Sequence, residues 1–328
     1  MLIMRTNTMT SIDSMTNENS SFPGSNAIDK QPQRIAKSTE NWTTIVGSAS
    51  GITDVVLLNV VSDTATVKVI DHSLTSVIDG TDISIASAVS IVSSSTDFSG
   101  FADGVSIVMK NWSNSGNNGV FVTNGASTSN VITVTGGLTA EASGNNIEIV
   151  EIDNQIEEDI TFAECKSYVD YFSGINYVTD RGFQQLNSDV ATATVVISLI
   201  GTLPSIGLIY SGKSRSYGRT QYGPMDNIED TSLYRRSTNG SLNQVQRPVL
   251  FGANPQIEAD NNEIYQIKNL FQRFNANAMV FILIPEDDTG IKSRYILYGR
   301  VERKPRVTWN LPNSQIYQLE ISPIGGYE

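Results

Sequence analysis

Residues 190–212 read VATATVVISLIGTLPSIGLIYSG, and this stretch sets the fold class that the sequence predicts. It carries no charged residue and is long enough to cross a bilayer as a helix. However, β-branched residues are frequent in it, and Gly201 and Pro204 interrupt it where two apolar runs meet. The pattern therefore favours a buried hairpin of two strands, 192–200 and 206–210. A membrane-contacting segment is the alternative.

The chain before this hairpin has the pattern of a β-rich module. From residue 42 to 150, short β-branched runs alternate with clusters of Gly, Asn, Ser and Asp. Apolar residues recur at every second position, as at Val67 and Val69, which is typical of strands with one buried face. Many short strands separated by turn residues predict a β-sandwich or a small barrel.

The C-terminal part combines a helix with strands. Residues 260–274, DNNEIYQIKNLFQRF, have apolar residues at helical spacing, and Asp260 and Glu263 stand in capping-box order. Strand-like runs follow at 278–284, 293–301, 306–310 and 315–322. We also predict a short helix over Thr161–Phe172, with Cys165 buried on its apolar face.

The predicted fold class is therefore mainly β with an α+β C-terminal part. It consists of an N-terminal β-sandwich or barrel-like module, followed by an antiparallel sheet domain covered by one or two helices. Residues 1–41 are polar and lack periodicity, so we predict a flexible N-terminal arm, or one that orders on a neighbouring subunit. Residues 42–155 form the acidic β-rich module. Residues 156–328 form an α+β ring-forming or assembly domain, with a long polar connection at 211–246.

Charge is distributed unequally between the two halves of the chain. The net charge is −12, and residues 1–160 account for all of it, with 18 acidic and 6 basic residues. Residues 161–328 hold 16 of each sign. Binding to nucleic acid depends on neutralising phosphates, so this balance argues against a stable nucleic-acid partner.

Scarce residue types exclude several kinds of site. Cys165 is the only cysteine and His72 the only histidine of the sequence, which excludes disulfide frameworks and Cys-rich or two-His zinc sites. Asp71 and Ser73 flank His72, but neighbours in a strand point to opposite faces, so we expect a histidine in a surface turn. The acidic turn at 286–290 lacks the ligand pattern of an EF-hand. We predict no cofactor, no metal and no enzyme, although carboxylate-based glycosidase chemistry is one hypothesis.

An ordered set of motifs lies between residues 89 and 149. It consists of TDF at 96–98, FADG at 101–104, SGNNG at 115–119 and LTAEASG at 138–144. In this order the motifs resemble a small β-module that recurs in tailed-bacteriophage structural proteins. The resemblance implies a virion structural role and no catalytic residue.

Residues 232–328 have a second resemblance. The motifs that carry it are YRRSTNG at 234–240, VFILIPE at 280–286 and LYGRV at 297–301. They are similar to those of phage tail and baseplate proteins, distantly of the distal-tail or tail-ring type. The resemblance implies a protein made in the host bacterial cytoplasm and located in the virion tail. Its partners would be further copies in a homo-oligomeric ring and other tail, neck or baseplate proteins.

Basic residues of the second half are the candidate assembly interface. They are Arg215, Arg219, Arg235, Arg236, Arg300, Arg303, Lys304 and Arg306. Arginine with interleaved tyrosine also suits single-stranded nucleic acid, but the neutral balance of this half favours a protein interface. The cluster can meet the acidic half of a neighbouring copy.

The sequence thus predicts a structural subunit of a bacteriophage tail or baseplate that assembles into a closed ring. A head decoration or host-surface binding protein is the alternative, with Trp112 either an exposed platform for glycans or a core residue. We expect no stable membrane partner.

Overall fold

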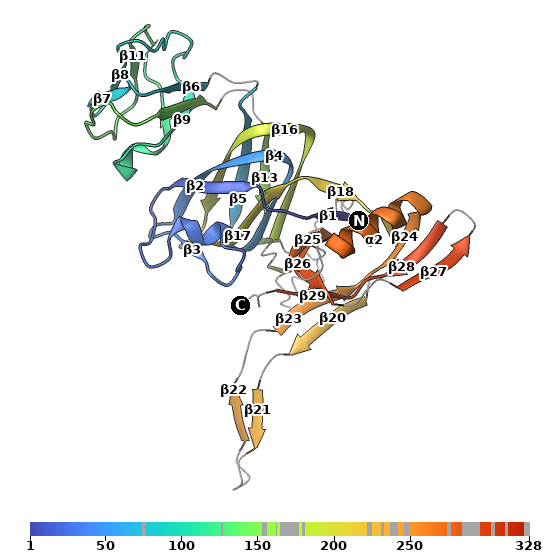
Figure 1. Cartoon of the computed structure of the whole chain (residues 1–328). Helices are drawn as coiled ribbons and strands as arrows, with labels where there is room; N and C mark the ends of the chain where they lie inside the picture. Colours follow the sequence, from blue (N-terminus) through green and yellow to red (C-terminus); the bar gives the residue numbers. More distant parts are fainter. Residues whose placement is uncertain are drawn as a thin grey trace.

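A computed structural model describes most of the chain (Figure 1). The described residues are 1–73, 77–125, 127–152, 156–161, 163–164, 177–178, 181–221, 225–230, 233–236, 242–245, 249–273, 277–283, 296–302, 306–311 and 314–324. In these residues antiparallel sheets dominate and a single α-helix occurs late in the chain. The predicted fold class is confirmed.

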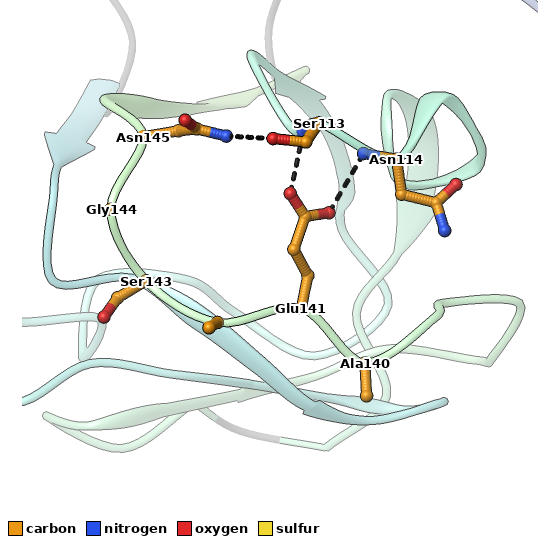
Figure 2. A pocket seen from close by; sticks show the side chains of 8 residues that line it. Ser113, Asn114, Ala140, Glu141, Ser143, Gly144 and Asn145 are labelled. Carbon is orange, nitrogen blue, oxygen red and sulfur yellow. Dashed lines mark hydrogen bonds between the residues drawn. The ribbon is translucent and has the colours of Figure 1, made fainter.

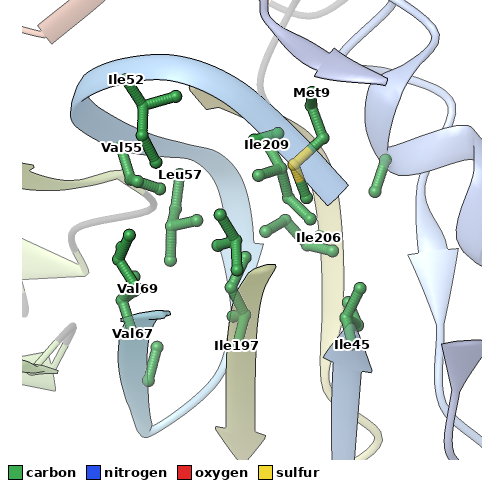
Figure 3. Packing of buried hydrophobic residues seen from close by; sticks show 14 of the residues in the cluster. Met9, Ile45, Ile52, Val55, Leu57, Val67, Val69, Ile197, Ile206 and Ile209 are labelled. Atoms are coloured by element: carbon green, nitrogen blue, oxygen red, sulfur yellow. The ribbon is translucent and has the colours of Figure 1, made fainter. Parts of the chain in front are cut away.

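A strongly curved, barrel-like sheet lies at the centre of the molecule (Figure 1). Its strand order is β13-β5-β16-β4-β17-β3, with β2 paired to β4. The strands are β2 (Met9–Met15), β3 (Ala36–Lys37), β4 (Trp42–Val61), β5 (Thr64–Asp71), β13 (Ile156–Thr161), β16 (Arg181–Ile200) and β17 (Ser205–Gly212). Side chains such as Ile45, Leu57 and Ile197 fill the concave side (Figure 3).

Two irregularities allow the long strands to curve. Gly51 in β4 has a φ of +61°, a left-handed conformation that glycine adopts without steric cost. Close to it, between the partners of Ile52 and Asp54, the register of β16 shifts between Gln185 and Val190. Such bulges bend a strand and increase its twist, so each strand can contribute to two parts of the barrel.

The two strands predicted within residues 190–212 are confirmed, but the prediction that they form a hairpin is wrong. β16 ends at Ile200 and β17 begins at Ser205, and β4 lies between them in the sheet and pairs antiparallel to both. In the part of the chain that the structure describes, no helix is long and apolar enough to cross a membrane.

The N-terminal residues are part of the fold, so the prediction of a flexible arm over 1–41 is wrong. β1 (Leu2–Met4) lies between β18 (Ser214–Ser216) and β25 (Met279–Ile282). Ile3 and Met4 are both fully buried because one faces the core under the helix and the other faces the barrel. A strand buried on both faces has no alternation, and three residues are too few to show a period.

Residues 77–151 form a separate small module, at the top left of Figure 1. Its strands are β6 (Val77–Gly80), β7 (Ser84–Ser87), β8 (Ser90–Val92), β9 (Ser106–Lys110), β10 (Gly119–Val122), β11 (Val131–Thr133) and β12 (Ile147–Glu151), with a 3-10 turn, η2 (Ser115–Asn117). They make two sheets, β10-β9-β12-β6 and β11-β8-β7, around a core of their own.

This module is inserted between β5 and β13 of the barrel. The predicted division at residue 155 therefore does not follow the sheets. β4 and β5 pair with β16 across the insertion, so residues 42–71 share a sheet with residues 181–212. Antiparallel pairing over such a sequence distance leaves no local signal in the chain.

The start of the helix predicted over Thr161–Phe172 is also wrong. Thr161 is the last residue of β13, which pairs with β5, and Ala163–Glu164 form β14, paired with β15 (Tyr177–Val178). β-sheet pairing overrides the helical spacing there. Cys165 and the rest of the predicted helix lie outside the described residues.

The C-terminal unit carries two sheets and the predicted helix. One sheet has the order β18-β1-β25-β26-β29-β23-β20 and the other β19-β24-β28-β27. The remaining strands are β19 (Arg219–Thr220), β20 (Met225–Asp230), β23 (Val249–Asn254), β24 (Gln256–Asp260), β26 (Ile296–Val301), β27 (Arg306–Leu311), β28 (Ser314–Gln318) and β29 (Ile321–Pro323). A further hairpin of β21 (Leu233–Arg236) and β22 (Leu242–Val245) extends away from them (Figure 1).

The helix α2 (Asn261–Arg273) confirms its sequence prediction in detail. The Asp260 carboxylate accepts a hydrogen bond from the Glu263 backbone N–H (2.7 Å), and the Glu263 carboxylate accepts one from the Asp260 N–H (3.0 Å). This reciprocal pair is a capping box, which satisfies two backbone donors at the helix start. Ile264, Ile267 and Leu270 are buried beneath the helix.

Candidate assembly surface

The outer face of the β4–β16 pair carries a regular series of side-chain pairs. Their register is Ser48–Thr194, Val46–Val196, Thr44–Ser198 and Trp42–Ile200. Residues directly opposite in register share one face of a sheet, and the residues between them fill the barrel core. Polar and apolar pairs therefore alternate along this face, and the two apolar pairs are Val46–Val196 and Trp42–Ile200.

At one end of this series the inserted module covers the barrel. Val46 is 0% exposed and Val196 4%, because they pack with Ile70 against Val108 and Val150 of the module. An apolar patch shared by the two units holds the module in place.

A buried lysine completes the same junction. The Lys110 ammonium, on β9 of the module, donates to Ser48 Oγ (3.0 Å), Thr194 Oγ1 (2.7 Å) and Glu148 Oε1 (3.2 Å). Asp13 Oδ2, from β2, lies 3.4 Å away, and the lysine side chain is 2% exposed. Since a buried charge requires partners, two carboxylates and two hydroxyls make its burial tolerable.

His72 belongs to this junction as well; it lies in a turn, as predicted, but it is partly buried there and not a surface residue. Its Nε2 lies 2.9 Å from Thr194 Oγ1 and 3.9 Å from Glu148 Oε1. Burial lowers the pKa of the imidazole, and Glu148 partly opposes that shift. The local sequence could not show that the module folds back over the end of β5.

At the other end of the series the apolar pair is exposed. Trp42 is 50% exposed and Ile200 57%. Three further exposed residues, Phe22, Val61 and Leu203, lie on the adjoining segments. We call these five residues the apolar tip.

Hydrogen bonds hold the segments of the apolar tip together. The Gly201 N–H donates to Asn41 O (3.0 Å), the Asp63 N–H to Ile200 O (2.9 Å) and the Ser38 N–H to Pro204 O (2.9 Å). The Lys37 N–H donates to Phe22 O (3.0 Å). Among the described residues nine large apolar side chains are exposed, and five of them lie at the tip. The tip is therefore an exposed apolar patch and not a set of isolated apolar residues.

Leu203 has an unusual backbone at the centre of the tip. Its φ is +50°, in the left-handed region that favours glycine. A non-glycine residue in such a conformation costs about 1–2 kcal/mol, and such strain clusters at functional sites. Its side chain is 41% exposed, so it is only partly covered by the described part of the chain.

The charges around the tip are mainly negative. The tip segments 17–22, 37–42, 61–64 and 200–205 hold Glu18, Glu40 and Asp63 against Lys37 alone. Glu40 and Asp63 are exposed. The rim of the tip therefore suits a basic partner.

The structure does not bring the predicted arginines together. Arg215 and Arg219 are exposed on β18 and β19, which belong to different sheets, and Arg300 is exposed on β26. Arg235 and Arg236 lie in the β21–β22 hairpin and Arg306 begins β27. Arg303 and Lys304 lie outside the described residues. The basic residues are thus spread over the C-terminal unit.

A shallow depression in the module offers another candidate site (Figure 2). Its Glu141 carboxylate accepts hydrogen bonds from the Ser113 N–H (2.7 Å), the Asn114 N–H (3.2 Å) and Asn117 Nδ2 (2.9 Å). Burial acts to raise the pKa of Glu141, but these hydrogen bonds outweigh it and lower the pKa. Both oxygens hold loops together, so the depression has a structural explanation.

A second acidic group in the module has the same explanation. The Asp82 carboxylate accepts hydrogen bonds from Ser93, Thr96 and Ser95, and these bonds lower its pKa well below the usual range. Within the described ranges no group of three His, Cys, Asp or Glu side chains could hold a metal.

Trp112 is a core residue, 4% exposed, so it offers no platform for a glycan. No protein-family model matches the sequence, and no curated protein matches it either. Sequence reasoning missed the apolar tip, although Ile200 stood at the end of a predicted strand and Trp42 at the start of the predicted β-rich module. Their exposure depends on which neighbours the fold supplies.

Proposed function

We propose that this chain is a structural subunit of a bacteriophage tail or baseplate and assembles into a closed ring through contacts between subunits. The observation that carries the proposal is the β21–β22 hairpin, which extends away from the body (Figure 1). Among the described residues its two strands pair with each other and with no third strand. An isolated two-stranded hairpin is marginally stable in water, so we expect it to be stabilised by packing against a neighbouring subunit.

The sequence resemblance supports the same proposal. Phe98, Phe101 and Leu138 of the phage-like motifs lie in the core of the inserted module. The motifs are therefore the residues that hold the module together, and the module is a self-contained unit attached to a barrel. This function requires assembly surfaces and no catalytic group.

The test is the mass of the protein in solution, by light scattering with negative-stain imaging, at low and high salt. We expect a closed ring, on the order of six or twelve copies, because repeated identical contacts close with rotational symmetry. A chain that stays monomeric at high concentration, and does not associate with virions, would contradict the proposal.

A hairpin-deleted variant makes this test specific. Asp230 and Val249 are already paired across β20 and β23, so a two-residue Asn-Gly turn can replace residues 231–248. We expect a folded protein with an unchanged circular dichroism spectrum that no longer forms rings. If this variant formed rings as stable as those of the unmodified chain, the hairpin would not be a subunit contact and the proposal would lose its main support.

A head decoration or host-surface binding protein is the second candidate. The observation that favours it is the inserted module, which has its own core and lies at the end of the barrel away from the apolar tip. Binding of the full-length chain to phage heads, or to host cells, without any ring formation would favour this alternative.

A further inference from the structure

We infer that the side chains of Lys110 and Asp13 become joined by an amide bond, with Glu148 as the proton carrier. Lys110 lies on β9 of the inserted module and Asp13 on β2 of the barrel, so the bond ties the two units together covalently. Such a bond goes beyond the proposed ring function and does not depend on it. The ionic contacts described above belong to the chain before this reaction.

The nucleophile and its target are held together away from bulk water. The Lys110 Nζ lies 3.4 Å from Asp13 Oδ2 and 3.2 Å from Glu148 Oε1. The lysine side chain is 2% exposed and that of Asp13 is 12% exposed. Two groups held in contact react as parts of one molecule, and exclusion of water favours a reaction that releases water.

A bulge in β2 places Asp13 beside the lysine. The register between β2 and β4 shifts between Ile12 and Ser14, so Asp13 lies at the irregularity. Ile12 packs against the core of the barrel, whereas Asp13 accepts a hydrogen bond from Ser48, on the outer face of β4. Bulges of this kind redirect a side chain and are frequent next to active sites.

The hydrogen bonds of Asp13 suit an attack on its carboxyl carbon. The Ser48 hydroxyl donates to Oδ2 (2.7 Å) and the Ser11 hydroxyl donates to Oδ1 (2.6 Å). Ser48 Oγ also accepts a hydrogen bond from the Lys110 ammonium (3.0 Å), so it connects the lysine nitrogen to Oδ2. The Ser11 donor can stabilise the negative charge that develops on Oδ1 when Cγ becomes tetrahedral.

The same connection supplies the neutral groups that the reaction requires. Transfer of one proton from Lys110 through Ser48 to Asp13 converts the ion pair into an amine and a carboxylic acid. Burial disfavours the charged form of both groups, so this transfer is easier at the junction than in water. The neutral amine of Lys110 is then a nucleophile.

The reaction is a condensation that balances without another reactant. The Lys110 Nζ lone pair forms a bond to Asp13 Cγ, and Glu148 takes the second proton from that nitrogen. The bond between Cγ and Oδ2 then breaks, and Glu148 returns the proton to the departing hydroxyl. Glu148 and Asp13 Oδ2 both lie against the same nitrogen, which suits this transfer. One water leaves, Glu148 is regenerated and the product is a neutral amide.

Mass spectrometry of the purified full chain, intact and after digestion with trypsin, tests the bond. The sequence places Asp13 in tryptic fragment 6–30 and Lys110 at the end of fragment 69–110. We expect a chain lighter by one water molecule, with fragment 6–30 joined to 69–166, because trypsin does not cleave after a lysine that has lost its charge. An unreduced mass, with 6–30 and 69–110 recovered separately, would overturn the inference.

Two variants identify the residues responsible. Lys110→Arg retains the positive charge but cannot form this amide, so its mass should equal that of its sequence. Glu148→Gln retains the shape of the glutamate but cannot carry the proton, so linkage should slow roughly 100-fold or more. A water loss that persists in Lys110→Arg overturns the bond to Lys110, and an unchanged linkage rate in Glu148→Gln overturns Glu148 as the proton carrier.

Lys213 and Asp189 are the matched control within the same chain. They also form an ion pair, but their side chains are 55% and 51% exposed. We expect no linkage there, because water stabilises both charged groups. Linkage at both pairs would contradict burial as its cause. If a variant fails to fold, the fragments of the unmodified chain still decide whether the bond exists, since that measurement requires no substitution.

Discussion

The two ends of the β4–β16 pair show how one strand pattern acquires two different surroundings. Beneath the module, Val46 and Val196 are buried, and Lys110 is enclosed by partners from both units. At the apolar tip, Trp42 and Ile200 face solvent beside an acidic rim. One end is an interface completed within the chain, and the other is an exposed apolar patch. The difference separates apolar pairs that stabilise the fold through burial from apolar pairs that contribute little to it.

The largest effect is expected at Lys110. Substitution Lys110→Ala leaves Asp13 and Glu148 without their shared cation at the junction, and removing one partner of a buried ion pair costs about 3–5 kcal/mol. Urea unfolding would measure the loss. Lys213→Ala is the matched control, because its ion pair with Asp189 is exposed and such pairs contribute about 0–1 kcal/mol. Equal losses in the two variants would contradict a buried role for Lys110.

The next effect compares the two ends directly. Val196→Ser should lower the free energy of unfolding by about 2 kcal/mol, because a fully buried valine contributes about 1.5–3 kcal/mol. Ile200→Ser, on the same strand and face, should change it by less than about 0.5 kcal/mol. Thermal unfolding at low protein concentration would measure both. A large loss at Ile200 would show that the tip is covered within the monomer.

A smaller effect of opposite sign is expected in the turn of the tip. Leu203→Gly relieves a left-handed conformation that costs about 1–2 kcal/mol, while the added glycine flexibility costs about 0.5–1 kcal/mol. The unfolding free energy should therefore rise by about 0.5 kcal/mol. Urea unfolding of the monomer is the measurement, and a clear destabilisation would show that the Leu203 side chain packs against the fold.

The smallest effect is a pH dependence at the module junction. Burial lowers the pKa of His72 below its ordinary 6.5, so the folded state favours the neutral imidazole. Glu148, Lys110 and Asp71 face it, and Glu148 and Asp71 oppose the shift that burial and Lys110 cause. The contribution to stability is present above pH 6.5 and is lost as the pH falls below that value.

The variant His72→Gln isolates this contribution. Between pH 7.5 and pH 5.5 the unmodified chain should lose more stability than the variant, as measured by urea unfolding at each pH. Parallel pH profiles would show that protonation of His72 does not oppose docking of the module.

Much of the local structure was predictable from the sequence by itself. The charge-free run of 190–212 predicted two strands, although not that β4 would lie between them, and Asp260 with Glu263 predicted the start of α2, because these signals lie within a few residues of each other. The β-branched runs between Trp42 and Val150 likewise predicted strands. Each inference depends on periodicity or on capping, which are properties of neighbouring residues.

Only the tertiary structure determined which elements pair with each predicted strand and which elements cover its faces. Leu2–Met4 became a central strand because two distant strands flank it, and His72 became partly buried because the module folds over it. Trp42 and Val46 have the same outward direction and similar apolar character, yet one is exposed and the other buried. The alternation of a strand specifies which face a side chain takes, but only long-range packing determines whether that face is covered.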